Sequence, residues 1–494
     1  MPSSAASEYS RAATLGGYAR KLSIAPKPSM NIHINNHYRS KVYTTGSEVT
    51  GHVTITPHTD VRFDMLQVVL LGTSKTRIDA VNIPQATSHT FLKLTMPIPE
   101  SSYPIPRIYE AGVIYTVPFT FIIPGTLTLN ACNHRVANES IQEHHVRLPP
   151  TVGSWEKDDF APNMSRIQYA VKARVYEEGI DGSGIKLMEA GHEIKVLPAI
   201  PEDAPLNVTK HDDMYTMQKS KTLRKTILSP KSGKVTVTAT QPGAAMLSPD
   251  GQTIAPTTVP LNFEFVPASG EARPPKVTGI SSKVTAVTYF SAGGINHYPN
   301  LKDWHRAFGS EGRGSYSGTT SVSTGPLSEV RWTRHLTAQA RRDSGYGSET
   351  LSSSDSDRTA RKRKASSPIF YNAHLQVPIR LPTHKKTFVP TFHSCISSRV
   401  YVLWLTVALA SGGATAHLTL GVPLQVGVGG VSGGSGDTAT AELPPSFEDV
   451  EEADANEYLR PRLMSVPTVD FQHSAALPGY ADLDYRRRRS VAAH

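Results

Sequence analysis

The sequence contains very few cysteines. Cys132 and Cys395 are the only two among 494 residues, and they do not form a CxxC pair. A disulfide framework needs several cysteines, and a zinc finger needs cysteine or histidine pairs at short spacing, so neither pattern is present. Such sparse cysteine usage is typical of a reducing compartment, and we expect a cytoplasmic protein.

Long apolar runs are also missing. The longest run, Val400 to Ala410, is well short of the ~20 residues that a membrane-spanning helix needs. Residues 1–23 lack the apolar core of a secretory signal. We therefore expect no secretory leader and only peripheral association with membranes.

The sequence lacks the usual catalytic and metal-binding motifs. Its 19 histidines form no HExxH motif and no Cys/His pairing at zinc spacing. Residues 430–434 fit G-x-S-x-G, but a Gly-rich linker surrounds them instead of a strand and a helix. We interpret His144 and His145, beside Glu143, as part of a solvated loop. The sequence predicts no catalysis, no metal and no cofactor, and an enzyme would need a site assembled from distant residues.

Composition favours a mixture of β-domains and disordered segments. Only 38% of residues are apolar, whereas 37 are proline and 36 are glycine. The net charge of +9 includes dense basic runs at 361–364 and 486–489. We favour solvated charge in a flexible segment over a nuclear signal or a lipid contact. Aromatic residues do not interleave these runs, so we expect no nucleic-acid partner.

Strand patterns divide the chain into two units. Residues 29–198 and 213–428 each show short apolar runs punctuated by proline and glycine, which predicts an antiparallel β-sandwich. Gly51 lies inside one such run, where a glycine often marks a bulge or a close approach of another backbone.

The segments outside these strand patterns are polar. We expect a disordered N-terminus at 1–28, a linker at 199–212 and a disordered tail at 429–494. Residues 303–367 are rich in Ser, Gly, Thr and Arg and have few large apolar side chains. Such a segment buries too little surface to offset its chain entropy, so we predict a disordered insertion in the second sandwich.

Residues 375–404 carry the clearest pattern. Leu375, Val377 and Ile379 alternate with polar residues or proline, as in a strand with one buried face, and the run 400–405 is apolar on both faces. The sequences VPIRLP, THKKTFVPTFHSC and ISSRVYVLWL closely resemble the late strands of the arrestin C-terminal domain in fungal alpha-arrestins. The Y-x-x-G-x-x-V-x-G-x-V pattern that starts at Tyr43 resembles the N-terminal domain of the same family. The resemblance implies two immunoglobulin-like β-sandwiches, an all-β fold.

The tail contains a motif of the L/P-P-x-Y type, formed by Leu477, Pro478, Gly479 and Tyr480. Proline in the polyproline II conformation fits between two aromatic rings of a WW domain, at low cost in conformational entropy. Alpha-arrestins resemble one another in carrying such motifs for HECT-type ubiquitin ligases. The resemblance implies that Leu477, Pro478 and Tyr480 bind these WW domains.

A second tail sequence departs from that motif. In Pro444-Pro445-Ser446-Phe447, phenylalanine replaces tyrosine, and the missing hydroxyl costs a hydrogen bond of about 1 kcal/mol. Pro444, Pro445 and Phe447 form either a weaker auxiliary WW ligand or no site.

The predicted insertion contains phosphorylation motifs. Ser344 and Ser366 follow basic residues, as basophilic kinases require, and Ser344 and Ser348 fit the D-S-G-x-x-S pattern that resembles a phosphodegron. A phosphate adds about −1.5 to −2 charge and strong acceptors. We expect phosphorylation in this segment to regulate the protein.

The resemblance implies a non-catalytic adaptor that is recruited to the plasma membrane or endosomes. It would link membrane cargo, a transporter or receptor, to a HECT-type ubiquitin ligase and so promote ubiquitination, endocytosis and protein transport. The alternative is an arrestin-like signalling scaffold that binds a receptor tail without a ligase, similar to the arrestin-like protein of fungal ambient-pH sensing.

Overall fold

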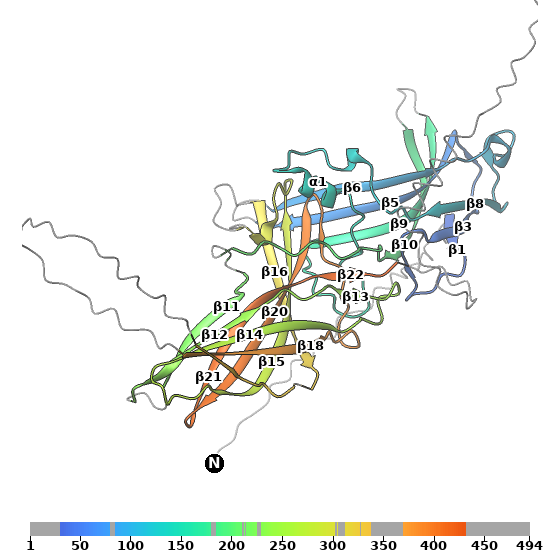
Figure 1. Cartoon of the computed structure of the whole chain (residues 1–494). Coiled ribbons are helices and arrows are strands. Elements are labelled where there is room, and N and C mark those ends of the chain that lie inside the picture. The colour runs from blue at the N-terminus through green and yellow to red at the C-terminus, as the bar shows by residue number, and fades with distance from the viewer. Residues whose placement is uncertain are drawn as a thin grey trace, which may run out of the picture. The chain divides into compact units, whose positions relative to one another are not determined.

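The computed structural model describes residues 30–79, 84–178, 184–209, 212, 214–224, 229–301, 304, 312–326, 328–336 and 369–430. All of them lie within one compact unit, Met1–Ser432. Strands dominate, mostly in antiparallel sheets, so the predicted all-β fold is confirmed (Figure 1). Within these ranges, no helix is long and apolar enough to cross a membrane.

The first half of the described chain contains two main sheets. A three-stranded sheet has the order β1 (Met30–Ile34), β3 (Glu48–Ile55) and β8 (Tyr115–Ile122). A five-stranded sheet has the order β2 (Val42–Tyr43), β10 (Gly184–Val196), β9 (Ser165–Glu178), β5 (Met65–Ile78) and β6 (Gln85–Met96). Their alternating apolar residues form one buried cluster.

Smaller elements complete the first half. They are β4 (Val61–Arg62) paired with β7 (Ile108–Tyr109), the 3₁₀ turns η1 (Glu100–Ser102) and η2 (Leu129–Ala131), and helix α1 (Glu139–His145). The expectation for Gly51 is confirmed, because a Cβ there would lie 2.1 Å from the carbonyl oxygen of His33 on β1. Only glycine lets β1 and β3 pair at this point.

The second half forms one large sheet that folds over its own core. Its order is β11 (Gln218–Arg224), β12 (Lys231–Ala239), β14 (Thr257–Pro267), β18 (Ile369–Arg380), β16 (Arg313–Thr324), β15 (Lys276–Ser291), β20 (Ser397–Ser411) and β19 (Phe392–His393). β17 (Thr333–Leu336) also pairs with β18, and β21 (Ala414–Leu424) with β20. β13 (Ala245–Leu247) pairs with β22 (Val426–Val428), and η3 spans Pro299–Leu301.

The strands predicted from 375–404 are confirmed. Leu375, Val377 and Ile379 of β18 are buried in the core of the second half, and the intervening residues are more exposed. Residues 400–403 of β20 are all buried. Tyr401 and Leu403 belong to the core of the second half, whereas Val400 packs in a separate cluster with Tyr289 and Trp304.

The prediction of a disordered insertion over 303–367 is wrong for part of that range. β16 and β17 lie inside it, and β16 pairs with β15 along Ser282–Ser291. β16 buries only Val322, so its stability comes from backbone pairing and from hydroxyl contacts such as Thr285–Thr319 at 2.8 Å. An argument from apolar content misses a polar strand of this kind.

Every ladder among the described residues joins strands of the same half, which agrees with two sandwiches. However, both halves belong to one compact unit. The side chains of Leu197 and Ile200, where the chain passes from the first half to the second, are also buried. The predicted boundaries at 198 and 213 therefore stay a prediction. Residues 1–28 and most of the predicted tail lie outside the described residues.

Candidate functional site at the junction of the two halves

Helix α1 supplies one wall of the junction. Asn138 caps it by accepting a hydrogen bond from the backbone N–H of Ile141 at 3.1 Å. One face of this short helix buries Ile141 and His145. The predicted solvated loop at His144 and His145 is therefore wrong. A cap and two buried side chains form a helix that is too short to give a periodic signal.

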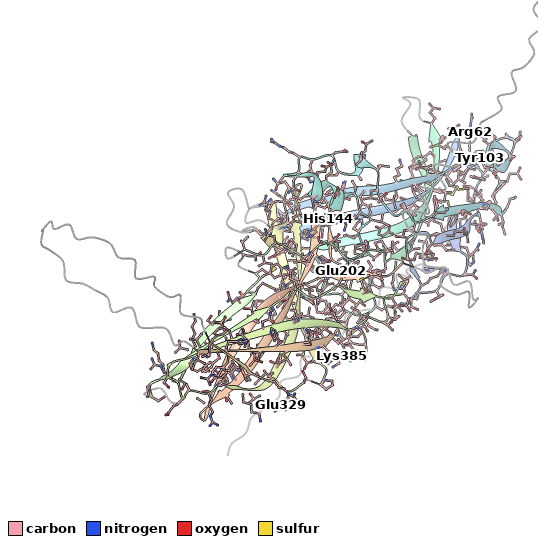
Figure 2. All side chains as sticks on the ribbon, in the orientation of Figure 1. Arg62, Tyr103, His144, Glu202, Glu329 and Lys385 are labelled. Atoms are coloured by element: carbon pink, nitrogen blue, oxygen red, sulfur yellow. The ribbon has the colours of Figure 1, made fainter. Side chains whose placement is uncertain are left out.

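A cavity of about 410 Å³ lies beside this helix. Residues of α1, of the segment 203–207 and of β19–β21 line it, so both halves contribute. Figure 2 labels His144 on α1 and Glu202 in the segment that connects the halves. The cavity is large enough to take a side chain or a short peptide segment.

Charged groups line one part of this cavity. Arg147 Nη1 donates to both carboxylate oxygens of Asp203, at 2.7 and 2.9 Å, and His144 Nε2 lies 3.4 Å from the same carboxylate. The hydrogen bonds from His144 and Arg147 lower the pKa of Asp203 to about 2. Asp203 is therefore ionised at neutral pH and connects the segment between the halves to α1.

Aromatic and imidazole rings also line the cavity. The Tyr298 hydroxyl lies 2.9 Å from Ser140 Oγ on α1, and its ring centroid lies 4.8 Å from that of His393. The His393 ring also meets the His144 ring edge to face, at 5.7 Å. These contacts pack β19 of the second half against α1 of the first.

A fully buried arginine forms a second part of the junction. Arg399 of β20 donates to Thr288 Oγ1 at 2.8 Å and to the carbonyl oxygens of Asp159 and Phe160 at 2.8 and 3.3 Å. These three acceptors satisfy most of its donors in a place that water does not reach. Arg399 thereby fixes the loop around residue 159 onto the second half.

That loop is held in an uncommon backbone conformation. Phe160 has a φ of 59°, which is rare for a bulky residue, and its side chain belongs to the core of the second half. The Asp158 and Asp159 carboxylates accept from the backbone N–H groups of Phe160 and Ala161, at 2.8 and 3.1 Å. Strained backbone of this kind persists where the surroundings over-determine it.

The structure does not describe the residues that the sequence singled out for WW binding and phosphorylation. Leu477, Pro478 and Tyr480, together with Pro444, Pro445 and Phe447, lie outside the described residues. The same is true of Ser344, Ser348 and Ser366. Their assignment as WW-binding and phosphorylation sites therefore stays a prediction.

The sequence argument missed a grouping that the fold creates. Cys132 and Cys395 meet, and His134 and His145 join them. The C-x-H spacing of Cys132 and His134 was a weak signal, but a contact across 263 residues depends on tertiary structure.

The mostly antiparallel all-β architecture is consistent with an arrestin-like protein. A family model described as the Bul1 C terminus matches residues 315–427, which include β18, β20 and β21. This match supports the same assignment and indicates an arrestin-like adaptor for a ubiquitin ligase, a class of protein that is generally non-catalytic. No curated protein matches the chain significantly.

Proposed function

We propose that the chain is a non-catalytic adaptor that links membrane cargo to a HECT-type ubiquitin ligase. The observation that carries this proposal is the Bul1 C-terminus match over strands of the second half. The L/P-P-x-Y motif at Leu477–Tyr480, beyond the last strand β22, supports it. The sandwiches would dock on a transporter or receptor, and the tail would recruit WW domains.

Such an adaptor acts by raising an effective concentration. When one chain holds cargo and ligase together, their encounter becomes intramolecular. The effective concentration of the ligase near the cargo then rises by orders of magnitude, although no new contact forms between the two. Ubiquitin on the cargo would then promote endocytosis. This mechanism places the protein at the plasma membrane or endosomes while it acts.

A binding experiment tests the recruitment step. The full chain is captured with isolated WW domains of a HECT-type ligase, as wild type and as Tyr480→Ala. Tyr485→Ala is the matched control, since it removes a nearby tyrosine outside the motif. We expect Tyr480→Ala to lose at least about tenfold in affinity, because the tyrosine pocket is left empty, and Tyr485→Ala to bind like wild type. Equal binding by all three would contradict recruitment through this motif.

A cellular measurement separates the adaptor from the scaffold. In cells without the protein, we expect cargo ubiquitination and turnover to fall. Unchanged cargo turnover together with a lost signalling output would favour the scaffold instead.

A further inference from the structure

Both cysteines of the chain meet at one buried point with two histidines. Cys132 follows η2, His134 lies two residues on, His145 ends α1, and Cys395 lies between β19 and β20. Each offers one ligand atom, and these four atoms all lie within 4.8 Å of one another. Three of the residues come from the first half and one from the second.

The separations fit a tetrahedral zinc site. With Zn–S of about 2.3 Å and Zn–N of about 2.05 Å, a tetrahedron has S···N edges of about 3.6 Å and an S···S edge of about 3.8 Å. Cys132 Sγ lies 3.5 Å from His145 Nδ1 and 3.8 Å from His134 Nδ1. No two of the four ligand atoms are more than 4.8 Å apart, which is about 1 Å longer than the ideal S···S edge.

The ring of His134 is oriented as a metal ligand would be. Its Nε2 lies 3.0 Å from the carbonyl oxygen of Ile295, which accepts its proton and leaves Nδ1 free to face the sulfur atoms. Metal-bound histidines typically donate their second N–H to such an acceptor. The ring also packs on the Gly294 backbone, where an added Cβ would lie 2.4 Å from His134 Cδ2.

The cluster lies in the interior of the protein. Cys132, Cys395 and His145 are 8%, 4% and 2% exposed, so water scarcely reaches these three residues. Buried polar groups of this kind are normally satisfied by a partner or a metal.

We propose that Cys132, His134, His145 and Cys395 bind one structural zinc ion. Two thiolates and two imidazoles are the ligand types that zinc prefers, and four protein ligands leave no open position for catalysis. Binding displaces the thiol protons to solvent and leaves both histidines neutral. The ion joins segments 263 residues apart and fixes the turn before β20 to the segment around α1.

The test measures zinc in the full chain, purified without a histidine tag from cells supplied with zinc. We expect about one zinc ion per chain in the wild type, and below about 0.1 in Cys395→Ser and in His145→Gln. His144→Gln is the matched control, because this histidine lies on the same helix but outside the four ligands; it should keep its zinc. Zinc content unaffected by either ligand substitution would overturn the proposal.

A second measurement uses the unaltered chain, in case a ligand variant fails to fold. Removing the ion with a chelator should lower the melting temperature by several degrees and make both cysteines reactive toward a thiol reagent. Wild-type protein without zinc, with two reactive thiols from the start, would contradict the site. A mass lower by two hydrogen atoms, with no reactive thiol, would show a disulfide instead of a metal centre.

Discussion

At the scale of single residues, Arg399 stabilises the junction of the two halves mainly through its hydrogen-bond partners. It is fully buried and bonds to the Thr288 hydroxyl of its own half and to two carbonyl oxygens of the first half. Hydrogen bonds that involve a charged group are the stronger ones, and removing one partner leaves the others buried and unsatisfied.

We predict that Arg399→Met lowers the free energy of unfolding by about 2–4 kcal/mol, because the Asp159 and Phe160 carbonyls lose their donors. Arg380→Met on the exposed face of β18 is the control and should change it by less than about 0.5 kcal/mol. Urea denaturation followed by fluorescence measures both. An Arg399→Met protein as stable as wild type would show that these bonds contribute nothing net.

At the scale of elements, β16 shows how the two halves interlock. Its Gly318 lies against Phe160 of the first half, and an added Cβ would approach Phe160 Cδ1 to 2.6 Å. The strand therefore provides both a partner for β15 and a flat surface for the loop that Arg399 holds.

We predict that Gly318→Ala destabilises the protein by about 1–3 kcal/mol, since the Phe160 ring must leave its place in the core. Gly279→Ala in the adjacent strand β15 is a matched control, because no atom lies within 4 Å of its added Cβ. Thermal unfolding of the two variants should separate them by several degrees. Similar melting temperatures would mean that the loop adjusts without cost.

An element can be predicted from the sequence when its apolar residues alternate with polar ones or form a continuous run. β18 was predictable from Leu375, Val377 and Ile379, and β20 from its continuous apolar run. β16 was not, because its side chains are polar and its stability comes from neighbours. Helix α1 depends on one cap and two buried side chains, and the meeting of Cys132 with Cys395 depends on the assembled fold. Long-range contacts leave no local pattern.

At the scale of the whole molecule, the ionised Asp203 couples the segment between the halves to α1. Its pKa of about 2 lies below the ordinary pKa of an aspartate, about 3.9. Its contribution to stability is therefore present above about pH 4 and disappears as the pH falls toward 2. The carboxylate is about one third exposed, and solvent screening reduces the effect.

We predict that Asp203→Asn lowers the free energy of unfolding by about 1–2 kcal/mol at pH 7, and that this difference shrinks as the pH falls from about 4 to 2. Urea denaturation at several pH values measures it. Asp79→Asn serves as a control, since its exposed carboxylate pairs with Arg77 two residues away and does not connect the two halves. A difference between wild type and Asp203→Asn that does not depend on pH would contradict the assignment.

Each half also contributes side chains to the core of the other. Val389 and Phe392 of the second half belong to the core of the first, whereas Phe160 and Leu197 of the first belong to the core of the second. Each core is therefore incomplete when its partner is removed. Opening one half takes packing away from the other, so the body should lose its structure in a single cooperative transition. A gene fragment that encodes only one of the predicted sandwiches would then produce a chain with an uncovered apolar face.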